Sequence, residues 1–295
     1  MTEAVQILSR GLGLGSVYAL LALGFVIIYK STRVISFAQP AFMLAGAVLV
    51  TYLVGPLGFF LALPLAAAGT AVLALGVERV AVRPMVGRPA FTVAIITLGI
   101  DVVVRVVATA FIGIDIRQVG DPWGLKPTVL LGVEVQQRHL AMIATTALLV
   151  TVLFAFFRFT RMGLAMRAAA YDQEAALAQG VSVGAVFAVS WGIAGALAAV
   201  GGTFAAIGGS VESTLWVIAL VALPVIILGG LDSLAGAVVG GLVVGVLQEV
   251  VATYQRSFPQ WLGGNVSIIT PYVVMFLVLL VRPYGLFGTR EVERV

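Results

Sequence analysis

An acid and a base stand inside one apolar run of the chain, where ionisable side chains are unexpected. Asp101 and Arg105 interrupt the run 90–112, and their spacing of four residues places them on one face of a helix. Ionisable residues within an apolar span are expensive to bury and by default mark a functional path. The same spacing lets the two charges neutralise each other where helices meet. We favour this structural role and keep ion coupling through Asp101 as the alternative.

The remaining residue types do not assemble into a catalytic or metal-binding motif. The lysines are Lys30 and Lys126, and neither follows a glycine, so the sequence has no phosphate-binding G-K-[ST] loop. The single histidine, His139, adjoins Arg138 at the edge of an apolar run, and cysteine is absent. A lone histidine at such a boundary is more often interfacial than a ligand. We therefore expect no catalytic residue, no metal site and no cofactor in this chain.

The composition indicates the class of protein. Of the 295 residues, 61% are hydrophobic and 10% are charged, whereas globular domains carry about 25% charged residues. Apolar runs of roughly 18 residues or more recur along the chain, which predicts an all-α polytopic integral membrane protein. The net charge of +4 comes from basic residues at the ends of these runs. This placement fits membrane topology, and we expect no nucleic-acid partner.

Nine apolar runs predict eight or nine transmembrane helices in one transmembrane domain, residues 1–295. We place the runs at 11–29, 36–54, 58–77, 90–112, 140–157, 183–208, 215–231, 234–253 and 266–281. The first is interpreted as a retained span and not a signal peptide, because its basic residues follow it. Basic residues cluster after the first, third, fifth and last runs: Lys30, Arg33, Arg79, Arg83, Arg88, Arg158, Arg161, Arg167, Arg282, Arg290 and Arg294. Since positive loops stay in the cytoplasm, we expect the N-terminus outside and the C-terminus inside.

The longest polar interruption, residues 158–182, falls on the cytoplasmic side of this topology. Its basic start gives way to an alanine-rich run, then to Asp172 and Glu174, and then to Gly180. Such a run favours a short helix, and glycine is a typical stop signal. Connections between spans need only a few residues. A loop that carries its own helix therefore indicates a docking site.

The external segment 113–139 carries charged residues, two prolines and Trp123. Such a composition is typical of a surface loop. We leave open whether this loop caps the outer mouth of a pathway or is a plain connection.

Two segments predict broken helices. Residues 36–41 place a glutamine and a proline near the start of the second run, and residues 228–236 place glycines and an aspartate between two short runs. Irregular backbone at membrane depth is tolerated where it is buried in protein or lines a wet cavity, and transporters build substrate paths from it. Polarity at broken or tightly packed positions suggests a small set of pathway residues: Tyr18, Ser36, Gln39 and Asp232.

Small residues recur four positions apart along several runs. The pairs include Gly11 with Gly15 and Gly241 with Gly245. This spacing lets membrane helices approach closely, and we expect these glycines to lie at helix contacts.

Several motifs together resemble one family. Glu174-Ala175-Ala176-x-x-x-Gly180, preceded by Gly163 and Arg167, is similar to the E-A-A-x-x-x-G motif of ABC importer permeases. Three further segments resemble the first-span, I-N-F-A-H/Q and L-G-G-x-G-S-x-x-G-A elements of branched-chain amino acid permeases of the Liv type, H-type subunit. They are residues 15–20, 34–39 and 228–237. These landmarks follow the family order over residues 10–285.

The chain departs from the family pattern where a pathway is expected. Ser36 stands where many members have Asn, Gln39 where many have His, and Asp232 where Gly is frequent. Pro40-Ala41 replaces a common Gly-Glu pair. The resemblance implies import of leucine-like amino acids. Because permeases of similar sequence take urea, short amides or aromatic acids, these remain alternative substrates.

The resemblance also implies partners and a mechanism. It implies cytoplasmic ATP-binding subunits that hold the ATP, a second permease subunit (homologous or identical) and an external solute-binding protein, all at a bacterial-type inner membrane. It assigns the contact with the ATPase to seven residues: Gly163, Arg167, Asp172, Glu174, Ala175, Ala176 and Gly180. Closure of the ATPase would shift the adjoining spans and alternate access to a central path for a small molecule. An ion-coupled secondary transporter and a passive channel are the alternatives, and we favour the importer.

Overall fold

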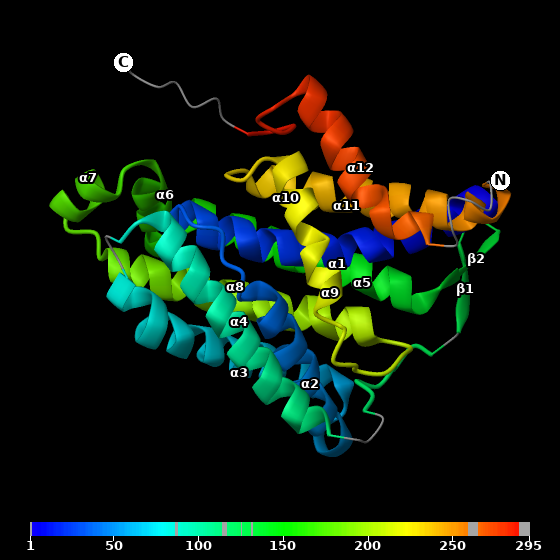
Figure 1. The fold of residues 1–295 in the computed structure, drawn as a ribbon. Coiled ribbons are helices and arrows are strands. Elements are labelled where there is room, and N and C mark those ends of the chain that lie inside the picture. Colours follow the sequence, from blue (N-terminus) through cyan, green and yellow to red (C-terminus); the bar gives the residue numbers. More distant parts are fainter. Residues whose placement is uncertain are drawn as a thin grey trace.

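The computed structural model describes residues 2–85, 88–113, 117–124, 126–130, 132–258 and 265–288. Figure 1 shows an elongated bundle of helices with one β-hairpin at the end that carries the N-terminus. The elements are α1 Thr2–Thr32, α2 Gln39–Leu57, α3 Phe59–Val77, α4 Ala90–Ile112, β1 Pro127–Leu130, β2 Val133–Gln136, α5 Gln137–Phe159, α6 Arg161–Tyr171, α7 Gln173–Ala178, α8 Val183–Ala206, α9 Val217–Leu220, α10 Ala222–Gly229, α11 Leu234–Tyr254 and α12 Val266–Val281. A π-helical turn, Glu78–Val82, and a 3-10 turn, Arg83–Met85, extend α3, and the 3-10 turn Gln255–Ser257 follows α11.

Seven helices in the described residues are long and apolar enough to cross a membrane. They are α1, α2, α3 with its extension, α4, α5, α8 and α11. The other two apolar runs form shorter helices, Val217–Gly229 and Val266–Val281. The prediction of an all-α, multi-pass membrane protein is therefore confirmed, whereas the count of eight or nine crossings stays a prediction because two of the nine apolar runs form short helices. Arg290 and Arg294 lie outside the described residues.

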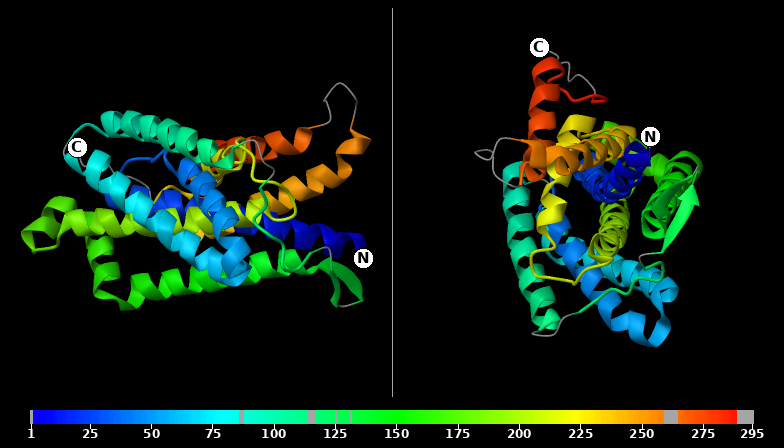
Figure 2. Two further views of the ribbon diagram at one scale, coloured as in Figure 1. Left: turned by 90° about the horizontal axis from the view of Figure 1, so that it is seen from below. Right: turned by 90° about the vertical axis from the view of Figure 1, so that its right-hand side faces the viewer.

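Helix α1 is the axis of the bundle. Within its span 89% of the residues are buried, against 22% in α3, α4 and α5, so these last three helices form the apolar outer surface. The end-on view in Figure 2 shows α1 enclosed by α5, α8 and α11. Because lipid tails are as apolar as leucine, an exposed apolar surface on the outer helices suits a bilayer.

Glycines bring the backbones of α1 and α11 into contact, as their spacing predicts. A Cβ added at Gly15 would lie 2.8 Å from the Gly241 carbonyl oxygen, and a Cβ at Gly11 would lie 2.7 Å from the Val246 Cα. Gly245 in turn packs on the backbone of Gly15. Without a hydrophobic force between helices in lipid, such close packing is a main source of association. The α1–α11 pair is thus held by backbone contact that a larger side chain would prevent.

The two ends of the bundle carry different elements. At one end α6 and α7 project beyond the spans, and the Gln173 side chain donates a 2.7 Å hydrogen bond to the Ser31 carbonyl at the end of α1. The β1–β2 hairpin and the N-terminus lie at the opposite end. There the Gln6 side chain donates to the Glu134 carbonyl oxygen at 3.4 Å.

The segment 113–139, predicted to be a surface loop, contains a β-hairpin. Strands β1 and β2 pair antiparallel, from Pro127 opposite Gln136 to Leu130 opposite Val133. Val133 and Val135 are buried, whereas Glu134 between them is exposed. This alternation is the period-2 pattern of a half-buried strand, which the charges and prolines of the segment obscure.

Replacing Gly245 by Ala tests the α1–α11 contact. We expect a loss of about 1–3 kcal/mol of stability, the usual effect of overpacking a tight contact, measured as a lowered thermal midpoint in detergent. Gly99→Ala in α4 is the matched control because a Cβ there meets nothing within 4 Å. The control should be neutral or slightly stabilising, since alanine favours helix by up to about 1 kcal/mol. Equal midpoints for both variants would contradict the close packing.

Candidate functional site

The loop between α5 and α8 begins with a sharp corner. The Thr160 hydroxyl accepts a 2.9 Å hydrogen bond from the Gly163 backbone N–H and so caps α6. Gly163 is buried, and a Cβ there would lie 2.6 Å from the Phe157 Cα. Only glycine fits this approach of α6 to the end of α5. Gly163 therefore sets the direction in which the loop leaves the bundle.

The loop contains two helices where the sequence predicts one. Helix α6 ends at Tyr171, and the Asp172 carboxylate accepts a 2.9 Å hydrogen bond from the Ala175 N–H, which starts α7. Aspartate is a strong helix N-cap, and here that preference overrides the helical propensity of the surrounding alanines. Gly180, with φ of +83°, then ends the loop in the left-handed conformation that glycine tolerates.

Both helices are fastened to the end of α1 but leave one surface open. Arg33 donates to the Ala170 carbonyl, and Gln173 donates to the Ser31 carbonyl. Ala176 is buried beneath α7, whereas Arg167, Glu174 and Ala175 are exposed. Two residues that the sequence analysis missed, Tyr171 and Leu177, are 92% and 56% exposed on the same loop. Apolar side chains held out beside charges are typical of a protein-docking surface. Their apolar type within a polar loop was the available signal.

Ser36 and Gln39 lie together where the chain enters α2. Both are buried, and the Gln39 amide donates a 3.0 Å hydrogen bond to the Ala194 carbonyl oxygen of α8. The Gln39 side chain packs directly on Gly24 of α1. Gln39 thus joins α1, α2 and α8 at the irregular backbone between Arg33 and Ala38.

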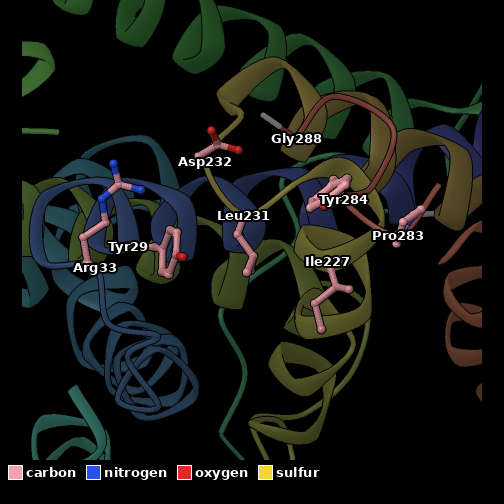
Figure 3. A pocket seen from close by; sticks show the side chains of 8 residues that line it. All are labelled: Tyr29, Arg33, Ile227, Leu231, Asp232, Pro283, Tyr284 and Gly288. Atoms are coloured by element: carbon pink, nitrogen blue, oxygen red, sulfur yellow. The ribbon is translucent and has the colours of Figure 1, made fainter. Parts of the chain in front are cut away.

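Asp232 and Tyr18 lie elsewhere, so the four suggested pathway residues do not form one site. The Tyr18 hydroxyl donates to the Gln248 side chain at 2.8 Å, across the α1–α11 contact. Asp232 lines a cavity of about 220 Å³ between the end of α1 and the break between α10 and α11 (Figure 3). Across this cavity lie Tyr29 and Arg33.

The C-terminal segment 282–288 completes the break between α10 and α11. The backbone N–H groups of Leu286 and Phe287 donate to the carbonyl oxygens of Leu228 and Gly229, at 2.8 and 3.0 Å. A helix leaves its last carbonyls without partners. The segment satisfies them, and Tyr284 closes one side of the cavity (Figure 3).

The intramembrane charges form an ion pair. The Arg105 guanidinium lies 2.7 Å from the Asp101 carboxylate and 4.0 Å from the centre of the Trp216 ring. One helical turn before Asp101, the Thr97 hydroxyl accepts a 3.0 Å hydrogen bond from the Phe37 N–H. The polar face of α4 therefore supports the entry to α2 as well as its own charge pair. Within the described part of the chain, no cluster of three His, Cys, Asp or Glu side chains could hold a metal.

Comparison with known proteins gives one family. The model of the branched-chain amino acid transport system permease component matches residues 7–281. The permease LivH of Salmonella typhimurium is 28% identical, with 99% of this chain and 97% of LivH covered. BraD of Pseudomonas aeruginosa is 27% identical, with 99% and 98% covered. Both are described as permease proteins of high-affinity branched-chain amino acid transport systems.

One solved structure has a similar fold. PsaBC from Streptococcus pneumoniae, in complex with Fab, has a TM-score of 0.50 at 14% identity, with 94% of this chain and 92% of that chain covered. At that identity the likeness concerns the fold alone. A similar arrangement of helices is thus known from another solved structure, whereas the site must be argued from this chain.

Single and double substitutions of the ion pair test its structural role. Asp101→Leu leaves the Arg105 guanidinium unpaired in a partly buried position, and we expect a loss of about 1–3 kcal/mol of stability. Replacing both residues by leucine removes both charges, and buried pairs replaced in this way are often neutral. The thermal midpoint of the double variant should therefore exceed that of Asp101→Leu. The reverse order would contradict mutual neutralisation.

Proposed function

Because the chain belongs to the family of permease components of branched-chain amino acid transport systems, we propose that it is the membrane subunit of an ATP-driven ABC importer. Its substrates are branched-chain or other hydrophobic amino acids, delivered by an external solute-binding protein. ATP is bound by separate cytoplasmic subunits, and a second permease, identical or homologous, completes the pathway. The assembly lies in a bacterial-type inner membrane. The supporting observation is the open, anchored surface of α6 and α7.

The distribution of charge supports an orientation for this importer. Lys30, Arg33 and Arg88 lie at the end of the bundle that carries α6 and α7. The segment 282–288 lies at the same end, because Arg33 and Tyr284 line one cavity. Positive residues are retained in the cytoplasm. This end, with α6, α7 and the C-terminal segment, is therefore the cytoplasmic one, and the N-terminus and hairpin are external.

The contacts of α6 and α7 suggest how the ATPase moves the spans. A subunit that grips Arg167, Glu174 and Ala175 pulls on two helices that are bonded to Ser31 and to Arg33. Arg33 begins the irregular link into α2, where Gln39 connects to α8. Movement of the loop is thus transmitted to α1, α2 and α8. These spans then shift between two arrangements, which open the pathway alternately to the two sides of the membrane.

Ion coupling through Asp101 is the competing function, and the geometry disfavours it. A coupling carboxylate has to bind and release its ion, whereas Asp101 is paired with Arg105 at 2.7 Å. Uptake by the double leucine variant separates the two functions. Uptake that persists and still requires ATP excludes coupling through this pair.

Urea, amides and aromatic acids remain competing substrates for the same machinery, and competition with labelled leucine distinguishes them.

Reversing the charge of Glu174 tests the docking surface. In a pull-down from solubilised membranes, an ATP-binding subunit should co-purify with the wild type and be reduced by about tenfold or more with Glu174→Arg, since like charges brought together at a contact cost several kcal/mol. Glu3→Arg is the matched control: it makes the same charge change on an exposed residue at the opposite end. Equal recovery of the ATPase with Glu174→Arg and Glu3→Arg would show that the loop is not part of the interface with the ATPase.

A further inference from the structure

A second cavity lies at the end of the bundle opposite to α6 and α7. Its volume is about 680 Å³, within the range of small-molecule sites. It is bounded by the start of α1, the start of α5, the end of α8, helix α9 and the end of α11. A smaller cavity of about 240 Å³ shares Arg10, Gln136 and His139 with it and is also lined by Glu134 of the hairpin. The two together form a path from the hairpin into the bundle.

Charges of both signs line this outer cavity. Arg10 lies 3.9 Å from Glu249, a long ion pair in which Arg10 is half exposed. Arg138 donates through Nε to the Gln136 side chain at 2.7 Å. Among the described residues, no carboxylate lies within 4.0 Å of the Arg138 guanidinium. Two guanidinium groups thus face one carboxylate, which leaves one positive charge for a ligand anion.

Two further features of the cavity are suited to a polar ligand. The Nδ1 atom of His139 is buried and has no hydrogen-bond partner in the described chain. Gly208, with φ of +82°, packs on the Arg138 guanidinium, so the absence of a side chain there makes room for this group. Helix α8 ends at Ala206, beside the cavity. The carbonyl end of a helix carries partial negative charge and favours a cation.

The remaining lining is apolar. Leu14 and Val17 of α1, Met142 of α5, Phe204 of α8 and Ile218 of α9 line the same cavity. Val17, Met142 and Phe204 are buried core residues. The cavity therefore combines an aliphatic and aromatic wall with separated positive and negative groups at its rim.

We propose that this outer cavity is a selection site for one aliphatic α-amino acid before translocation. The Arg138 guanidinium binds the α-carboxylate, Glu249 and the carbonyl end of α8 bind the α-ammonium group, and the apolar wall receives the side chain. This inference rests on the proposed function and adds to it the residues that discriminate the substrate. A ligand that lacks either charge leaves one partly buried charged group without its partner, and such a loss discriminates strongly between ligands.

Analogues that lack one charge test the two assignments separately. In vesicles containing the complete transporter, leucine uptake is measured in competition with leucinamide, which lacks the carboxylate, and with 4-methylpentanoate, which lacks the amine. Arg138→Gln should raise the KM for leucine about tenfold, the effect of losing one charge-assisted hydrogen bond, and leave inhibition by leucinamide unchanged. Glu249→Gln should raise the KM for leucine and leave inhibition by 4-methylpentanoate unchanged.

A matched variant and a binding assay control for damage to the fold. Lys126→Gln removes one positive charge at the same end from an exposed residue outside both cavities, and its KM should equal that of the wild type. Since the chain has no cysteine, Ile218→Cys can be labelled alone with a maleimide, and leucine should slow the labelling. Leucine should not protect Val217→Cys, which is 45% exposed and does not line the cavity.

The failures of the two proposals are distinguishable. If the wild type shows no ATP-dependent uptake of leucine, the proposed function fails. If the wild type transports leucine, but Arg138→Gln and Glu249→Gln match Lys126→Gln and leucine does not protect Ile218→Cys, the selection site is refuted while the importer stands.

Discussion

The contact of the α1 and α11 backbones is the constraint on which the rest of the structure depends. Gly15 and Gly245 let the two helices touch without side chains between them. In lipid, where helices gain nothing by hiding apolar surface from one another, this closeness supplies dispersion contacts that larger residues would remove. It also makes α1 a rigid axis. Both ends of that axis carry candidate sites, with Arg33 holding α6 at one end and Arg10 facing Glu249 at the other.

Some of the polar groups inside the bundle support breaks in the helices. Thr97 accepts a hydrogen bond from the link that precedes α2, and Gln39 connects that link to α8. At the second break, the C-terminal segment donates to the last carbonyls of α10. Irregular backbone in a bilayer requires such partners. Because these bonds cross between spans, the breaks are the places where we propose that movement of α6 and α7 changes how the spans pack.

The sequence predicted the positions of the helices along the chain far better than the contacts between the helices. Hydropathy located the apolar helices, because a bilayer leaves little alternative to helix, but α1 begins nine residues before the predicted run 11–29, and the run 215–231 forms both α9 and α10. The division of the loop 158–182 into two helices was missed although Asp172 is a strong N-cap. Of the suggested pathway residues, Ser36 and Gln39 lie together whereas Tyr18 and Asp232 lie elsewhere, and His139, next to Arg138, was interpreted as interfacial. Their shared cavity is lined by residues of α1, α5, α8 and α11. Local sequence patterns do not predict contacts between elements that lie so far apart in the chain.

The most direct test of this account is the side of the membrane on which α6 and α7 lie. The chain has no cysteine, so single cysteines can be placed at Tyr171, which is 92% exposed, and at Lys126 near the hairpin. A membrane-impermeant maleimide is then applied to spheroplasts before and after permeabilisation. The account predicts labelling of Lys126→Cys in intact spheroplasts and of Tyr171→Cys only after permeabilisation. Labelling of Tyr171→Cys from outside would contradict it, because ATP-binding subunits could not reach the loop.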